Sequence, residues 1–171
     1  MFQLPFPVHD VNASSGSKDL GDLPEWDLSD LYSSQDAPEL SRDLQWLDQE
    51  CASFAADYEG KLAHLDAEEM LNCVLRNERI NTIAGRIMSF AGLRYYQLTV
   101  DGDRTKFMSD MQEKITDFTT PLVFFTLELN RIDDPALQAL LNANDALARY
   151  QPVFDRIRAM KPYQLSDELE K

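Results

Sequence analysis

The chain has 171 residues, 44% of them hydrophobic and 27% charged, and a formal net charge of −14. This length fits one domain, with or without a loose arm, and the composition excludes a chain that is disordered throughout. Residues 1–60 hold thirteen acidic residues against Lys18 and Arg42, a net of −11, which leaves −3 for residues 61–171. Because phosphate repels such a surface, we expect no unaided binding to nucleic acid and no docking on an anionic membrane.

Cysteine usage and the start of the chain indicate the compartment. Cys51 and Cys73 are the only cysteines. We interpret them as two small buried side chains in separate helices, with a redox pair as the alternative, and a reducing compartment fits this usage. Residues 1–7 carry neither a basic residue nor an uninterrupted apolar run, so they predict no signal peptide and no membrane span. We expect a cytoplasmic protein.

The amino-terminal part reads as an arm followed by a helical domain. Residues 1–23 combine Pro, Ser, Gly, Asn and Asp without periodicity, which is typical of a flexible arm. We place the helical domain at residues 24–171. Its first segment, residues 24–32, mixes large apolar and acidic residues, as an extended stretch or a single helical turn does.

A first long helix is predicted after Asp36. The stretch Asp36-Ala-Pro-Glu39 has the spacing of a capping box, and Pro38 is tolerated in a first turn. Apolar residues then recur at steps of three and four, which stacks them on one helix face. Gly60 is placed to end the helix. The apolar positions are Leu40, Leu44, Leu47, Cys51, Phe54 and Tyr58.

A second long helix is predicted from the capping box Asp66-Ala-Glu-Glu69 to about Thr99. Four arginines lie off its apolar stripe, and we interpret them as a solvated or salt-bridging face, with an anion or substrate clamp as the alternative. These arginines are Arg76, Arg79, Arg86 and Arg94.

The third predicted helix runs from Asp103 to Arg131 and has the most regular pattern. Pro121 falls inside it and should kink or split it, because proline lacks an N–H and crowds the preceding turn. The apolar stripe consists of Phe107, Met111, Ile115, Phe118, Leu122, Phe125 and Leu129.

Shorter helices complete the prediction. Asp134 as cap and Pro135 at the first position start a helix that ends near Leu141, and a turn leads to a helix from Ala146 to about Met160. Residues 166–168 have the pattern of a further helix start close to the last residue, so we expect the natural polypeptide to continue. The predicted fold class is all-α, an antiparallel helical bundle of three long helices plus two or more short helices.

No catalytic, cofactor-binding or metal residue is predicted in this chain. The only histidines are His9 and His64, and no His-Glu-x-x-His or Glu-x-x-His motif occurs. Paired carboxylates such as Glu68-Glu69 lie at predicted helix starts, where the helix dipole favours them. We interpret the prominent aromatic residues as packing, with a ligand groove near residues 95–96 as an alternative. These aromatics are Trp26, Trp46, Tyr95, Tyr96, Phe124 and Phe125.

Four motifs carry a resemblance to a known family. In chain order they are Pro24-Glu-Trp-Asp-Leu-Ser-Asp-Leu-Tyr32, Tyr58-Glu-Gly-Lys61, Phe124-Phe125-Thr-Leu-Glu128-Leu, and the stretch from Tyr150-Gln-Pro to Pro162-Tyr-Gln-Leu-Ser166. Together they resemble the amino-terminal region of oligoendopeptidase F-type zinc metallopeptidases, which are relatives of thimet oligopeptidases. No one motif is diagnostic, but their order and spacing are those of the family.

The resemblance implies an amino-terminal helical region that forms part of the wall of the substrate channel in a zinc endopeptidase acting on short peptides. The zinc-binding helix of that family lies beyond the matched stretch, so zinc belongs to the full-length enzyme and none is expected here. The implied partners are the remainder of the peptidase chain and short peptides, and the acidic front could face basic peptides. The sequence does not decide between a monomer and a homo-oligomer. The alternative is a stand-alone acidic helical module that binds other proteins.

Overall fold

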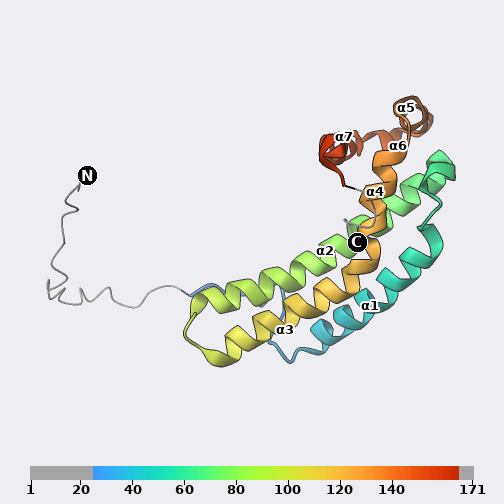
Figure 1. Cartoon of the computed structure of the whole chain (residues 1–171). Helices are drawn as coiled ribbons and strands as arrows, with labels where there is room; N and C mark the ends of the chain where they lie inside the picture. The colour runs from blue at the N-terminus through green and yellow to red at the C-terminus, as the bar shows by residue number, and fades with distance from the viewer. Residues whose placement is uncertain (1–24, 166–171) are drawn as a thin grey trace, which may run out of the picture.

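The computed structural model describes residues 25–165, and these residues form helices joined by short connections, with no strand among them (Figure 1). The all-α prediction is confirmed. Three long helices, α1 (Pro38–Tyr58), α2 (Ala67–Gln97) and α3 (Gly102–Thr119), lie side by side. Each runs opposite to the one before it because the connections are short. The predicted arm at residues 1–23 and the predicted helix start at residues 166–168 lie outside the described residues.

The remaining helices gather beside the end of the fold where α1 meets the start of α2 (Figure 1). Here α4 packs against α7, while α5 and α6 pack against α2. The elements concerned are η1 (Leu62–His64), η2 (Thr120–Leu122), α4 (Val123–Arg131), α5 (Asp134–Ala143), α6 (Asp145–Ala148), α7 (Gln151–Arg158) and η3 (Lys161–Tyr163).

The core is one continuous apolar cluster to which all the α-helices contribute. Tyr32 ties the segment before α1 into it: the ring meets the edge of Phe90 at 5.4 Å, and the hydroxyl donates to Asp43 at 2.6 Å. The largest fully buried side chains are Tyr32, Phe54, Phe90, Phe154, Leu40, Leu47, Leu62, Met70, Ile80, Ile87, Leu129 and Leu147.

The two predicted capping boxes have different outcomes. At α2 the box is present, since Asp66 accepts from the backbone N–H groups of Glu68 and Glu69 and its own N–H donates to Glu69. At α1 the prediction is wrong, because the cap is Ala37 and no side chain caps the helix. The Glu39 carboxylate accepts the hydroxyl of Ser33 instead. Pro38 in the first turn has no N–H, which lowers the number of donors that need a cap.

Helix α1 ends where the sequence predicts, just before Gly60. Gly60 has φ of 79°, a left-handed conformation that glycine adopts without steric cost, and α1 stops two residues before it.

Pro121 splits the third predicted helix, as expected, into α3, the 3-10 turn η2 and α4. The hydroxyls of Thr119 and Thr120 donate back to the carbonyls of Ile115 and Thr116 at this break. Helix α3 starts earlier than predicted, at Gly102, because Asp101 caps it by accepting the N–H of Arg104 at 3.0 Å.

Two predictions for the later helices are wrong. The cap of α5 is Asp133, not Asp134. The helix predicted from residue 146 to 160 is two helices, because Pro152 lies in the first turn of α7. A proline there has no N–H for the carbonyl four residues earlier, and its ring crowds that carbonyl, so α6 cannot continue. Asn144 caps α6 by accepting two backbone N–H groups.

Candidate functional site

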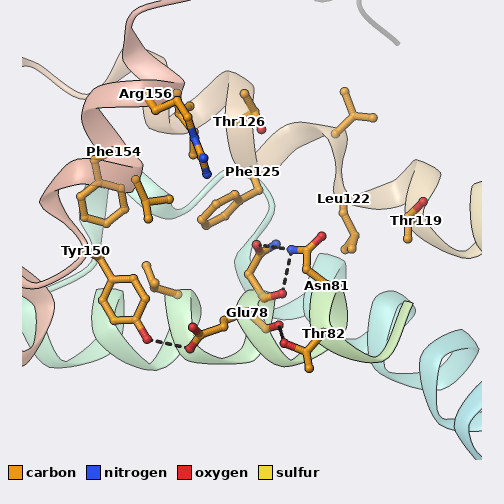
Figure 2. Close-up of a pocket in the computed structure, with 15 residues that line it drawn as sticks. Glu78, Asn81, Thr82, Thr119, Leu122, Phe125, Thr126, Tyr150, Phe154 and Arg156 are labelled. Carbon is orange, nitrogen blue, oxygen red and sulfur yellow. Dashed lines mark hydrogen bonds between the residues drawn. The ribbon is translucent and has the colours of Figure 1, made fainter. Parts of the chain in front are cut away.

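A groove of about 690 Å³ lies between α2, the break at η2 and α4, and α7 (Figure 2). Its volume is in the range of sites that hold small ligands. The lining residues are Val74, Asn77, Glu78, Asn81, Thr82, Thr119, Leu122, Val123, Phe125, Thr126, Tyr150, Val153, Phe154, Arg156 and Ile157.

The base of the groove is apolar. Phe125 and Phe154 are buried, at 7% and 1% exposure, and belong to the core. Leu122 and Ile157 are half-buried and pack against that core from the groove side. An apolar group that enters the groove would therefore meet a surface backed by packed side chains.

The α2 wall is polar. Glu78 accepts the hydroxyl of Tyr150 at 2.7 Å, a contact between residues 72 positions apart that joins α2 to the start of α7 (Figure 2). This bond to a carboxylate is the main reason why the pKa of Tyr150 is raised. One turn along, the amide nitrogen of Asn81 donates to both the backbone and the side-chain oxygen of Asn77 at 2.8 Å.

Helix α7 carries two arginines with different surroundings, of which only Arg156 lines the groove. Arg158 donates to the carbonyls of Leu129 and Ile132 at 2.7 Å and to Asp134, so it ties α7 to the end of α4. Arg156 is exposed, lines the groove and has no ion pair or hydrogen-bond partner among residues 25–165. Figure 2 shows its guanidinium end reaching toward the groove near Phe125.

The structure does not bring His64, Cys51 and Cys73 into a common site. His64 is exposed in η1, and His9 lies outside the described residues. Cys51 and Cys73 are buried and free. Burial raises the pKa of Cys51 to about 11 and that of Cys73 to about 12, so both are neutral thiols near pH 7.

The described residues do not fit a zinc site. No group of three or more His, Cys, Asp or Glu side chains between residues 25 and 165 is arranged to hold a metal ion. In the same part of the chain, no helix is both long and apolar enough to cross a bilayer.

The four arginines of α2 divide into two pairs. Arg76 donates to Glu50 and Asp57 at 2.7 Å, and Arg86 donates to Asp43 and to the carbonyl of Leu31, as the salt-bridging interpretation predicts. All four guanidinium groups lie over aromatic rings, for example Arg79 over Trp46 at 5.2 Å and Arg94 over Phe90 at 5.6 Å, but among the described residues Arg79 and Arg94 form no ion pair.

The aromatic residues singled out from the sequence differ in how far they are buried. Phe124 and Phe125 are buried, as predicted, and Trp46 is half-buried. Trp26 and Tyr96 are 67% and 72% exposed, so the packing interpretation is wrong for them. Neither Tyr95 nor Tyr96 lines the groove between α2 and α7 or the smaller pockets beside Trp26, Ser109 and Asn130.

The motifs that carry the family resemblance meet in space as structural connections. The carboxylate of Glu128 accepts the backbone N–H groups of Gly60 at 2.6 Å and Leu62 at 3.2 Å, which joins α4 to the connection between α1 and α2. The backbone carbonyls of Trp26 and Leu31 accept bonds from side chains of α2. These contacts hold the fold together.

The groove residues Glu78, Tyr150 and Arg156 were not among the candidates from the sequence. Tyr150 and Arg156 lie in the stretch that carries the last family motif, but nothing in that stretch marks them as groove residues. Glu78 lies in no motif, and α3 to α6 separate it from them along the chain. The one available signal was the position of Arg156 beside the apolar residues of the last predicted helix, and this pattern is also usual for a solvated face.

Comparison with known families identifies the class of the carboxyl-terminal part. Residues 128–171 match the family model for the amino-terminal domain of M3 peptidases, a metallopeptidase family. The description of that model is Oligopeptidase F. The resemblance to an oligopeptidase F-type amino-terminal region is therefore confirmed over residues 128–171, whereas the motifs at residues 24–32 and 58–61 lie outside the match. Comparisons with curated proteins and with solved structures gave no match.

Proposed function

We propose that this chain is the amino-terminal helical region of a zinc-dependent oligoendopeptidase, that the groove between α2 and α7 belongs to the wall of its substrate channel, and that the region is inactive alone. The observation that carries the proposal is the family match at residues 128–171, which includes the α7 side of the groove. The remainder of the peptidase chain is then the partner, and short peptides in the cytoplasm are the substrates.

The chemistry of the groove supports this role. A channel for varied short peptides needs a surface that accepts apolar side chains and offers hydrogen bonds to peptide groups without strict sequence preference. The base around Leu122 and Phe125 supplies the first, and the amide and hydroxyl groups of Asn81 and Thr126 supply the second. The zinc ligands and the catalytic base would come from the rest of the polypeptide.

The enzyme proposal is tested on the complete natural polypeptide with internally quenched fluorescent peptides of increasing length. We expect cleavage of short peptides that a chelator abolishes and added zinc restores, and no cleavage by the 171-residue chain alone. If the complete polypeptide cleaves none of these peptides, the proposal is overturned and the stand-alone protein-binding module is favoured.

The channel-wall role is tested with Thr126→Trp, which places a large ring at an exposed position of the groove lining. We expect a higher KM and a shorter upper limit of peptide length, with kcat for the shortest peptides unchanged, because the chemistry lies elsewhere. The matched control is Ala136→Trp on the exposed face of α5, outside the groove. Equal kinetics for both variants would exclude the groove from the channel.

A further inference from the structure

We infer that the groove binds the free carboxylate of a short peptide through Arg156, with an apolar side chain of the peptide against Leu122 and Phe125. This inference deepens the proposed channel-wall function and rests on it for the presence of peptides. It adds what that function does not specify: which end of the peptide this groove takes, and which side chain holds it.

The charge of Arg156 is the first reason. Among the residues that the structure describes, Arg156 and Glu78 are the only charged groups that line the groove, and they come from opposite walls. The neighbouring Arg158 is engaged by two carbonyls and by Asp134, whereas Arg156 has no partner within the described part of the chain. A guanidinium binds a carboxylate through two parallel N–H bonds, and a charge at the edge of an apolar base gains strength from partial exclusion of water.

The base of the groove is the second reason. The guanidinium of Arg156 reaches toward Phe125 in Figure 2, so a carboxylate held there has the apolar base beside it. In a peptide, the last side chain leaves the same carbon atom as the terminal carboxylate. A terminal residue with a large apolar side chain therefore pairs its carboxylate with the guanidinium of Arg156 and, at the same time, fills the space over Leu122 and Phe125.

The opposite wall sets the orientation. The amide nitrogen of Asn81 donates to Asn77, and this bond fixes the orientation of the amide. The side-chain oxygen of Asn81 is then left to accept a peptide N–H. The Glu78 carboxylate, held by the Tyr150 hydroxyl, disfavours an acidic side chain in the preceding position. The expected ligand is thus a short peptide with an apolar last residue, a free terminal carboxylate and no acidic residue before it.

Binding of acetyl-Gly-Phe and of its carboxyl-terminal amide to the 171-residue chain, measured by isothermal titration calorimetry, tests the inference. Acetylation removes the ammonium group, so Glu78 cannot attract either ligand. We expect the acid to bind roughly tenfold more tightly than the amide, the increment of one charge-assisted pair at a partly exposed site. Arg156→Gln should remove this difference, and Arg156→Lys should retain part of it.

The matched control is Arg149→Gln, which removes an exposed arginine between α6 and α7 that does not line the groove. Far-UV circular dichroism checks that each variant folds. Equal binding of acid and amide, unchanged discrimination in Arg156→Gln, or no binding of either ligand at millimolar concentration overturns the inference. The peptidase assay on the complete polypeptide judges the proposed function separately, so the two can fail independently.

Discussion

Glu128 is a single side chain that connects two parts of the chain 68 residues apart. Its two oxygens accept the backbone N–H groups of Gly60 and Leu62, where the chain turns from α1 toward α2. These N–H groups have no helix to pair with, so the carboxylate takes the place of a cap. This contact explains why a glutamate suits this position in a helix that otherwise faces the core.

Glu128→Ala should lower the free energy of unfolding by about 1 kcal/mol, because it leaves the N–H of the buried Leu62 without an acceptor, whereas water can reach the N–H of the exposed Gly60. Urea denaturation followed by circular dichroism measures the change. Glu113→Ala, on the exposed side of α3, is the control and should stay within about 0.5 kcal/mol of the parent chain. Similar losses in both variants would refute the capping role.

The thiols give a second prediction at the residue scale. Cys51 and Cys73 are 1% and 0% exposed, and burial raises the pKa of both above the ordinary value of 9.0. At pH 8 we expect neither thiol to react with Ellman's reagent in the native chain and both to react in urea. Stoichiometric reaction of the native chain within minutes would contradict the buried placement.

The same pKa shifts predict a dependence of stability on pH. In the folded chain the thiols keep their protons to about pH 11 and about pH 12, whereas in the unfolded chain they lose them near 9.0. The thiol contribution to stability is therefore complete below pH 9 and is lost as the pH rises from 9 toward 12. Urea denaturation at pH 8 and pH 10.5 should show a smaller loss in Cys51→Ala/Cys73→Ala than in the parent chain; an equal loss would argue against this cause.

At the scale of elements, the contact between α4 and α7 holds the groove open in its observed shape. Arg158 is the side chain that fastens it, since its guanidinium reaches the last carbonyls of α4 and the first turn of α5. Its side chain is only 11% exposed, so the bonds to the two carbonyls are partly shielded from water, whereas Asp134 is exposed.

Arg158→Ala should lower the free energy of unfolding by about 2 kcal/mol and raise hydrogen exchange in α7 more than in α2, because α7 has few other attachments. Hydrogen exchange with mass spectrometry measures the second effect. The comparison is Arg149→Ala, an exposed arginine for which no such bonds exist in the described chain, and little change is expected. Uniform loss of protection in both variants would speak against the fastening role.

Some helix boundaries are set by residues of the same turn, and others are set by tertiary contacts. Asp66, Gly60 and Pro121 act through the backbone of their own turn, and their effects were predicted from the sequence. The capping box at Asp36 failed because Glu39 bonds Ser33, a residue held in place by the segment anchored through Tyr32. The prediction of a single helix over residues 146–160 is wrong because Pro152 breaks the helix although the apolar spacing continues across it.

For the whole molecule, charge is the property most open to test. With a net charge of −14, repulsion between carboxylates opposes the compact state. We expect the free energy of unfolding to rise when sodium chloride increases from about 0.01 M to about 0.15 M, over which the screening length falls from about 30 Å to about 8 Å. Asp30→Asn/Asp48→Asn, which neutralises two exposed carboxylates, should reduce this salt dependence. A fall in stability with salt would mean that the Arg76 ion pairs outweigh the repulsion.

The sequence by itself determined the fold class, most helix boundaries and the resemblance to the oligopeptidase F-type amino-terminal region, because helix periodicity, caps and prolines are local signals. The groove was decided only by the tertiary structure. Glu78 and Tyr150 meet because the start of α7 comes back beside α2, and Arg156 is distinguished from Arg158 only by which carbonyls lie within reach. Such contacts depend on how helices pack, which no spacing along one helix encodes.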